Sequence, residues 1–242
     1  MKLDRSITKI GDKTEQLPIL WYLIKWTIIG AVAGALIGSA SALLLASLNW
    51  ATDYRENHLW IIALLPLGGL AIGLMYHYLA GTAAKGNNFL IEEIRSSRNI
   101  IPFKMAPLVY IGTVLTHLFG GSAGREGTGV QMGGAIADFM SRLFRMHPYD
   151  RKIMIQIGIG AGFASIFGTP LAGAVFALEV IIVGRLRYDA ILSAFFANLT
   201  CHAWGIAHTH YSINYTPAID MQTLLLVLTA SIILGSTSDI QC

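Results

Sequence analysis

Long apolar blocks with almost no charged residues divide this chain. Residues 59–84 contain no Asp, Glu, Lys or Arg, and residues 20–52 contain only Lys25. Four further blocks without these residues are 105–124, 153–178, 190–219 and 221–238. A helix that crosses a bilayer needs about 20 apolar residues. The blocks therefore predict an all-α, polytopic membrane protein.

The blocks predict eight apolar helices, several of them short. They are expected near 19–50, 58–79, 104–119, 126–144, 151–166, 170–184, 188–207 and 218–237. A short polar helix is expected at 87–97. The breaks coincide with the stretches FGGSAGREG and FGTPLAG. Backbone that is broken at membrane depth must be hidden in protein or line a wet cavity, and transporters use such breaks to aim helix ends at an ion.

The distribution of Lys and Arg predicts the orientation of the chain. Basic residues gather in segments 85–104 and 185–187, which we expect on the cytoplasmic side. Residues 1–18 are expected to form a cytoplasmic N-terminal segment, and 19–242 the transmembrane domain. The outer side is expected to hold two loops with little or no positive charge, 53–57 and 207–217.

Charge and cysteine content exclude other classes of partner. The net charge of +3 is small and spread over the loops, so we expect no nucleic-acid partner. The two cysteines, Cys201 and Cys242, predict neither a metal site nor a disulfide framework.

The stretch GGSAGREGTGVQMGG, residues 120–134, is the strongest candidate site. Its glycines end one helix, and a new helix begins near Arg125 and Glu126. The first turn of a helix has unpaired N–H groups and about half a positive charge, which together make an anion site. Glu126 can occupy that site with its own carboxylate. Glycines at 124, 127 and 129 allow a small ion to approach the backbone.

Three other interpretations of this stretch stay open. A phosphate-binding loop of a nucleotide enzyme needs a Gly-Lys-Ser/Thr sequence after a strand, and neither is present, so we do not expect an enzyme. A surface loop with a solvated Arg–Glu pair is the second. Helix-packing glycines with an incidental salt bridge are the third. We favour the anion site, because an ionisable pair inside a membrane is by default a functional candidate.

Three motifs resemble the CLC family of chloride channels and proton-coupled anion antiporters. Gly124-Arg125-Glu126-Gly127 is similar to the family's G-K/R-E-G-P signature. The stretch GIGAGFASIFGTPLAGAVFALEV at 158–180 resembles the signature that follows it. Gly86-Asn87-Asn88-Phe89-Leu90 stands where the family has Gly-Ser-Gly-Ile-Pro. The order of the motifs is the same, and the resemblance covers the chain from residue 19.

The resemblance implies a fold of two inverted halves of broken helices, whose N-termini converge on anion sites at the midplane. It implies transport of a halide, chloride or fluoride, by a homodimer in a bacterial inner membrane, as a channel or an anion/proton antiporter. Glu126 is then the gate that couples transport to protons: ionised, it occupies the place of the anion, and protonated, it swings out. The implied anion-binding residues are Gly86, Asn87, Gly124, Arg125, Gly127 and Thr128. No metal or other cofactor is implied.

Three departures from the family pattern resemble its fluoride-exporting branch. Thr128 replaces the Pro of the signature, and Asn87 replaces a Ser that touches chloride. Val180 stands where chloride/proton antiporters have a second Glu after Glu179, the inner proton relay. An Asn amide offers N–H donors, which a small, strongly hydrated anion such as fluoride needs in place of water.

The resemblance extends only to the first half of the family fold. Nothing after residue 180 resembles the second half, with its Gly-x-Phe-x-Pro-type segment and inner-site Tyr. We therefore expect residues 19–242 to be a truncated first half that does not conduct alone. The alternative function is a non-conducting membrane fragment or an assembly partner.

The remaining polar residues are expected to have structural or interfacial roles. Asp138 is expected to cap or pair locally, and Glu179 to be a buried hydrogen-bonding carboxylate. His202, His208 and His210 lack metal-ligand spacing.

Overall fold

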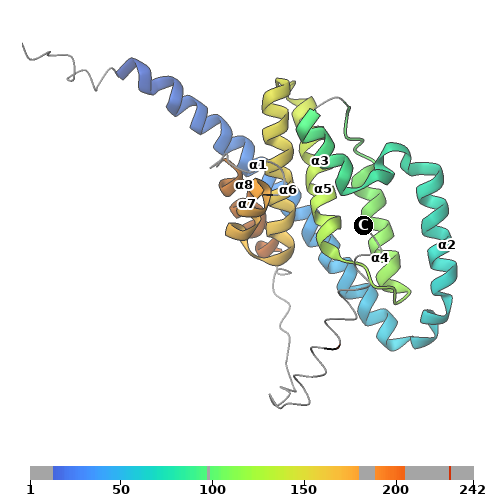
Figure 1. The fold of residues 1–242 in the computed structure, drawn as a ribbon. Helices are drawn as coiled ribbons and strands as arrows, with labels where there is room; N and C mark the ends of the chain where they lie inside the picture. Colours follow the sequence, from blue (N-terminus) through green and yellow to red (C-terminus); the bar gives the residue numbers. More distant parts are fainter. Residues whose placement is uncertain (1–12, 97–98, 180–188, 205–228, 230–242) are drawn as a thin grey trace, which may run out of the picture. The chain divides into compact units, whose positions relative to one another are not determined.

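The structure of this protein is a computed structural model that describes residues 13–96, 99–179, 189–204 and 229. Apart from Thr229, these residues belong to one unit, Met1–His208. Every regular element within them is a helix (Figure 1), which agrees with the all-α fold predicted from the apolar blocks.

Eight α-helices and three short helical turns follow one another along the described residues. They are α1 (Lys13–Asn57), the 3₁₀ turn η1 (Leu59–Leu64), α2 (Leu65–Met75), the π-helical turn η2 (Tyr76–Ala80), the 3₁₀ turn η3 (Gly81–Lys85), α3 (Asn87–Ser96), α4 (Met105–Leu118), α5 (Arg125–Leu143), α6 (Pro148–Phe167), α7 (Pro170–Glu179) and α8 (Asp189–Ala203).

The two ends of α1 depart from the sequence prediction. The helix begins at Lys13, before the predicted 19, and runs without a break to Asn57, beyond the predicted 50. The segment 53–57, predicted as an outer loop, is the last turn of this helix. Charged residues do not end a helix by themselves, and Asn57 Nδ2 donates to the Asp53 carbonyl at 2.8 Å within that turn.

The other predicted helices are confirmed where the structure describes them. Helices α3 to α6 lie within a few residues of their predicted ranges. The predicted helix 58–79 is divided into η1, α2 and η2, with a Pro at the start of α2. The predicted helix 218–237, the loop 207–217 and the basic residues at 185 and 187 lie outside the described residues.

Helix α5 packs between α6 and α4, and glycines make its contact with α6 close (Figure 1). A β-carbon on Gly133 would overlap the Gly158 carbonyl, and one on Gly162 would overlap the Gly129 carbonyl. On the other face of α6, a β-carbon on Gly160 would lie 2.8 Å from the Gly173 carbonyl. These glycines are therefore packing positions. Gly129, predicted to help an ion approach the backbone, faces α6 instead.

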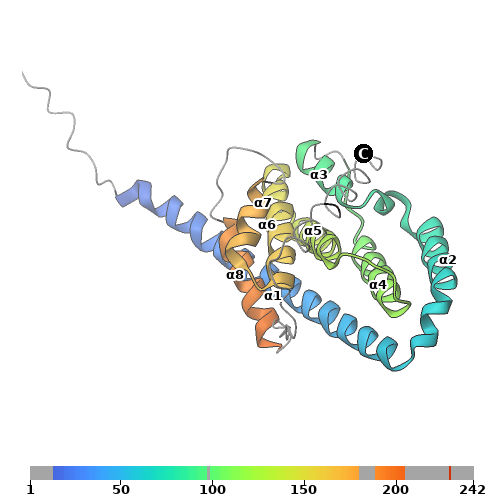
Figure 2. The same ribbon diagram turned by 60° about the horizontal axis from the view of Figure 1, so that its bottom comes forward.

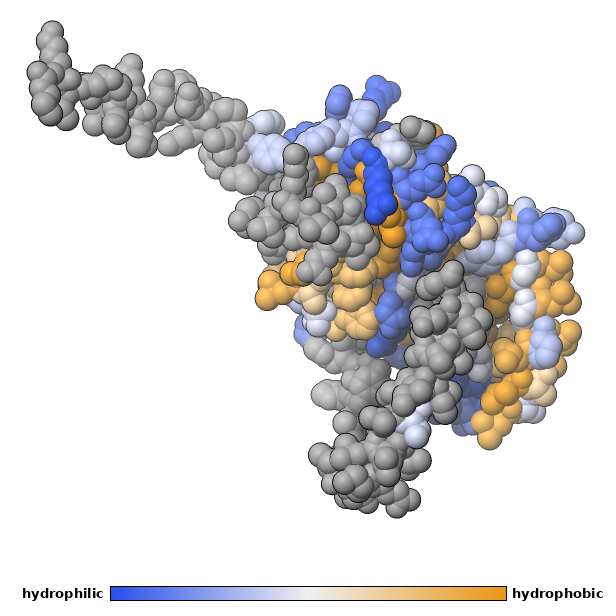
Figure 3. All heavy atoms as spheres, in the orientation of Figure 1, coloured by the Kyte–Doolittle hydropathy of each residue, from blue (hydrophilic) through white to orange (hydrophobic). Residues whose placement is uncertain are grey.

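Two stretches of the described residues are long and apolar enough to span a membrane, Ile24–Asn57 and Leu59–Ser96. Helix α4 lies between α1 and α2 (Figure 2). Leu67 and Leu70 of α2 are 61% and 60% exposed. Figure 3 shows hydrophobic residues over α2, and hydrophilic residues over the end of the unit that holds α3 and the start of α6. This pattern is that of a polytopic membrane protein.

A polar cluster with two buried carboxylates, made of Glu93, Asn99, Asp138 and Arg151, ties α3 and α5 to the first turn of α6. Glu93 and Asp138 are fully buried. The Arg151 guanidinium donates to Asp138 Oδ1 at 2.5 Å and to the Asn99 carbonyl at 2.8 Å. Glu93 accepts from the backbone and side-chain N–H groups of Asn99 at 2.7 and 2.8 Å. Each carboxylate is therefore paired, as burial of charge requires.

The second oxygen of Asp138 also has partners. Oδ2 accepts from the Ile101 N–H at 3.1 Å and lies 3.4 Å from Arg142 Nε, four residues further along α5. The prediction that Asp138 pairs locally is confirmed by Arg142. Asp138 also has two partners that were not predicted, the Ile101 N–H and Arg151 of α6. These contacts hold the segment that connects α3 to α4.

Candidate anion site at the start of helix α5

Helix α5 begins where the Gly-rich stretch predicts a helix start. Gly124 is its N-cap, with extended backbone angles of φ −73° and ψ 131°, and it has no side chain to cap the helix. The N–H groups of the first turn therefore have no side-chain acceptor from the N-cap position. An acceptor for them must come from elsewhere: water, a neighbouring side chain or a bound anion.

The Glu126 carboxylate folds back over the start of its own helix. A β-carbon on residue 124 would overlap Glu126 Oε2. The side chain is exposed, and within the described residues it has no ion pair. A negative charge at a helix N-terminus is stabilised by the helix dipole. The carboxylate thus lies at the N-terminal end of its own helix.

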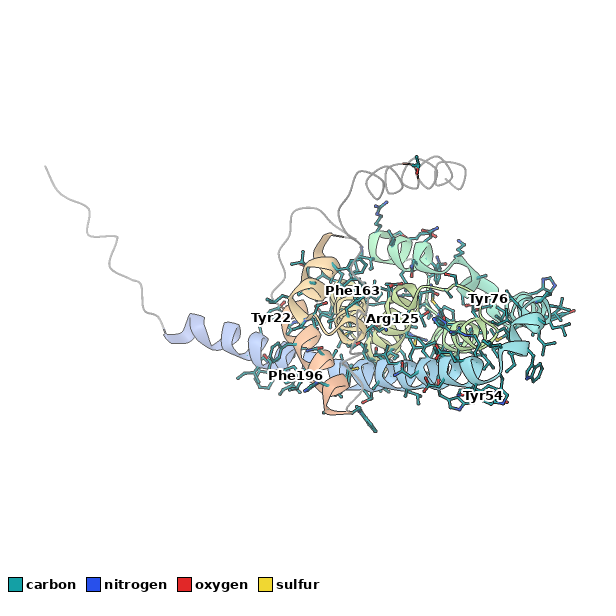
Figure 4. All side chains as sticks on the ribbon, turned by 90° about the horizontal axis from the view of Figure 1, so that it is seen from below. Tyr22, Tyr54, Tyr76, Arg125, Phe163 and Phe196 are labelled. Atoms are coloured by element: carbon teal, nitrogen blue, oxygen red, sulfur yellow. The ribbon has the colours of Figure 1, made fainter. Side chains whose placement is uncertain are left out.

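Arg125, the residue before it, does not neutralise Glu126. Its side chain is half-buried and forms no ion pair within the part of the chain that is described. Figure 4 shows Arg125 in the middle of the unit, between Phe163 of α6 and Tyr76 of η2. Of the alternatives from the sequence, helix packing describes Gly129 and Gly133, which lie against α6, whereas an Arg125–Glu126 salt bridge is absent from the described residues.

The start of α3 meets the start of α5. Gly86, just before α3, has a positive φ of 59°, a backbone conformation that Gly adopts without strain. A β-carbon on Gly127 would lie 3.4 Å from Asn87 Nδ2, and one on Gly86 would lie 3.5 Å from Gln131 Nε2. The two motifs predicted to share an anion are therefore neighbours in space.

Thr128 is the predicted site residue whose side chain is directed elsewhere. It is buried, and its hydroxyl lies 2.6 Å from the Thr113 hydroxyl of α4. This hydrogen bond joins the first turns of α5 to α4. The Thr128 hydroxyl thus holds the helix start in position, and it does not face Asn87.

Arg55 fixes the break between α4 and α5, and the sequence gives no sign of this role. Its Nη1 donates to the His117 carbonyl at the end of α4 at 2.9 Å. Gly120, with φ 79°, lies against the same side chain, since a β-carbon there would be 3.4 Å from Arg55 Cδ. The guanidinium is a further donor to a carbonyl that also accepts from the Gly120 N–H at 3.2 Å.

The structure therefore unites most of the predicted residues. Gly86, Asn87, Gly124, Glu126 and Gly127 lie at the two helix starts, and Arg125 lies beside them. No group of three metal-ligating side chains occurs within the described residues. Glu179 is the last residue of α7, and its side chain lies outside the described part of the structure. Val180, His208 and His210 lie outside it altogether.

The sequence matches a family model over this site. Residues 68–240 match the model described as "Voltage gated chloride channel". The chain belongs to the voltage gated chloride channel family. The match includes both helix starts, and the family resemblance inferred from the motifs is confirmed.

Two curated relatives extend the comparison. The "Chloride/fluoride channel protein" of Pseudomonas syringae pv. tomato is 48% identical over 93% of this chain and 51% of its own length. The "H(+)/Cl(-) exchange transporter ClcA" of Vibrio campbellii is 25% identical over 86% of this chain and 48% of its own length. The chain therefore spans about half the length of the relatives it matches.

Two solved structures share the fold. A CLC-type fluoride/proton antiporter superposes with a TM-score of 0.74, at 31% identity, over 89% of this chain and 56% of its own. A slow cyanobacterial Cl⁻/H⁺ antiporter superposes with a TM-score of 0.51 at 22% identity, over 88% of this chain and 54% of its own. The described helices thus have the fold of about half of a CLC-type antiporter chain.

Proposed function

We propose that this protein transports halide anions across a membrane, and that the Glu126 carboxylate competes with the halide for the start of α5. One observation carries the proposal: two helix starts meet, with the Asn87 amide beside Gly127 and a carboxylate folded over Gly124. Unpaired first-turn N–H groups and the helix dipole attract an anion. The Asn87 amide adds N–H donors.

Protonation of Glu126 is the proposed link between anion and proton movement. The ionised carboxylate excludes the halide from the helix start, whereas the protonated one loses its attraction to the dipole and leaves. Proton and halide binding are then linked, so each promotes the other. An anion/proton antiporter and a proton-gated channel both follow from this linkage, and no catalysed chemical conversion is involved.

We propose fluoride as the preferred halide. Asn87 in place of a hydroxyl residue gives the site stronger, more localised N–H donors. Support also comes from relatives that are named a chloride/fluoride channel protein and a fluoride/proton antiporter. The Gly86 and Gly127 positions leave the approach to these donors open, and Arg125 adds a nearby positive charge.

The proposed topology has the N-terminus in the cytoplasm, in a bacterial inner membrane. Lys25 of α1 lies 3.7 Å from Asp150 at the start of α6, so these ends share one side. Lys152 donates to the Arg95 carbonyl at 3.0 Å on that same side. Such concentrations of Lys and Arg remain cytoplasmic.

The proposed assembly is a homodimer with a separate pore in each subunit. Apolar side chains on α7 and α8 are at least half exposed and available to a second copy; they are Leu171, Val175, Phe195 and Leu199. Cross-linking between copies through cysteines placed on this face of α8 would test the assembly.

Flux measurements test the transport proposal. The complete gene product is reconstituted into liposomes loaded with fluoride or chloride, and anion and proton efflux are recorded with selective electrodes. We expect fluoride efflux to exceed chloride efflux and to be accompanied by proton uptake. Equal flux of the two halides would refute the fluoride preference, and absence of both would refute transport.

A further inference from the structure

We propose that the Gln131 side-chain amide is a further halide contact, and that it helps to determine which halide is selected. Gln131 lies on α5, beyond the signature residues 124–127. The inference rests on the proposed function and deepens it by naming a residue that the motif does not include.

The first argument is position. Gln131 follows Gly127 by one helical turn, so the two residues lie on one face of α5. Asn87 Nδ2 faces Gly127, and Gln131 Nε2 faces Gly86, at 3.4 and 3.5 Å from the β-carbon positions. Two amides, each set against a glycine, therefore lie where the helix starts meet.

The second argument is the lack of a protein partner. Gln131 is half-buried, and within the described residues its amide forms no hydrogen bond. An amide carries two N–H donors and a carbonyl acceptor, and those of Gln131 are not among the buried unpaired atoms, so they remain accessible. On the same helix, Thr128 and Asp138 have partners from other elements. Gln131 is thus available to a ligand.

The third argument is the chemistry of the ligand. A small halide such as fluoride holds its water tightly, so a site must replace several donors at once. The first turn of α5, the Asn87 amide and the Gln131 amide together supply them. A larger halide with a lower charge density depends less on each donor. Loss of the Gln131 donors therefore affects fluoride more than chloride.

Gln131→Met is the informative substitution, because it keeps the length and shape of the side chain and removes its N–H donors. Gln156→Met on α6 is the matched control: Gln156 is also half-buried, and it is not among the nearest neighbours of Gly86 or Gly127. Binding of sodium fluoride and sodium chloride to the complete gene product in detergent is measured by calorimetry, together with the thermal midpoint of each variant.

We expect Gln131→Met to weaken fluoride binding about tenfold or more, the effect of losing one hydrogen bond to a charged partner. Chloride binding should weaken less, and Gln156→Met should leave both affinities unchanged. If Gln131→Met fails to fold, Gln131→Glu is used, which keeps the side-chain shape and replaces the donors with a carboxylate. It should weaken fluoride binding further.

Two results would overturn the inference. Fluoride affinity that is unchanged in a folded Gln131→Met or Gln131→Glu variant would refute it while leaving the proposed function intact, provided Glu126→Gln still alters halide binding. Absence of halide binding in the unmodified protein would refute the proposed function, and the role of Gln131 with it.

Discussion

Helix α5 carries two polar regions that are built in opposite ways. At its start, Glu126 lies on the helix end and pairs with no charged group among the described residues. Further along the helix, the Asp138 carboxylate is fully buried. It accepts hydrogen bonds from the Arg151 guanidinium and from a backbone N–H. The difference indicates that the paired Asp138 carboxylate fixes the helix in place, whereas the described residues hold the Glu126 carboxylate by no such pair.

Removing the charge of Glu126 should have the largest effect on function. Glu126→Gln resembles the protonated side chain permanently, so the carboxylate no longer competes with the halide. We expect anion flux in liposomes to lose its entire response to pH, and proton movement to stop. Glu56→Gln, an exposed Glu at the end of α1, is the control and should retain the pH response. An unchanged pH response in Glu126→Gln would show that this carboxylate is not the gate.

Removing the charge of Asp138 should have the largest effect on stability. Asp138→Asn removes the shorter of the two carboxylate contacts of the partly buried Arg151 guanidinium and leaves Glu93 at 4.0 Å. We expect the free energy of unfolding to fall by about 2–3 kcal/mol, below the range for a buried charge left without any partner. Asp150→Asn breaks only the partly exposed contact with Lys25, and should cost less than about 1 kcal/mol. Denaturant unfolding in detergent compares the two. Equal stability of the two variants would contradict the structural role of the cluster.

Two glycines of α5, Gly133 and Gly127, should differ in whether substitution affects stability or halide affinity. A β-carbon on Gly133 overlaps the Gly158 carbonyl, so Gly133→Ala should destabilise the protein by about 1–3 kcal/mol. A β-carbon on Gly127 meets the Asn87 amide at 3.4 Å, an ordinary contact. Gly127→Ala should therefore leave the thermal midpoint unchanged or raise it, while lowering the halide affinity. A large loss of stability in Gly127→Ala would remove this distinction.

The sequence predicts the local parts of this arrangement well. Glycine spacing and the Arg-Glu pair suffice to place the start of α5 near residue 125, because helix starts follow short-range rules. The sequence predicts that Gly129 helps an ion to approach, and this is wrong because Gly129 faces α6. Glycine spacing alone does not tell which face of the helix the residue occupies.

Contacts between distant segments could not be predicted in this way. Arg55 reaches the His117 carbonyl, and Arg151 reaches Asp138, only because the helices cross as they do. The Gln131 amide faces Gly86 for the same reason. In a single sequence such residues have no distinguishing pattern, and the crossing of α3 over α5 must be known first.

The smallest predicted effect concerns Thr113 and Thr128. Their hydroxyls lie 2.6 Å apart in a buried contact between α4 and α5. Replacing each by Val, singly and together, should reveal a coupling free energy of about 1 kcal/mol in a double-mutant cycle. If the two substitutions are additive in the free energy of unfolding, the hydrogen bond does not hold the helix start.

The competition between carboxylate and halide is tested most directly by equilibrium binding as a function of pH. Calorimetric titration of fluoride into the complete gene product, with and without Glu126→Gln, measures it without transport. The unmodified protein should bind fluoride more tightly as the pH falls, because protonation withdraws the competing carboxylate, and Glu126→Gln should bind tightly at every pH. The same affinity and the same pH dependence in both proteins would contradict the account.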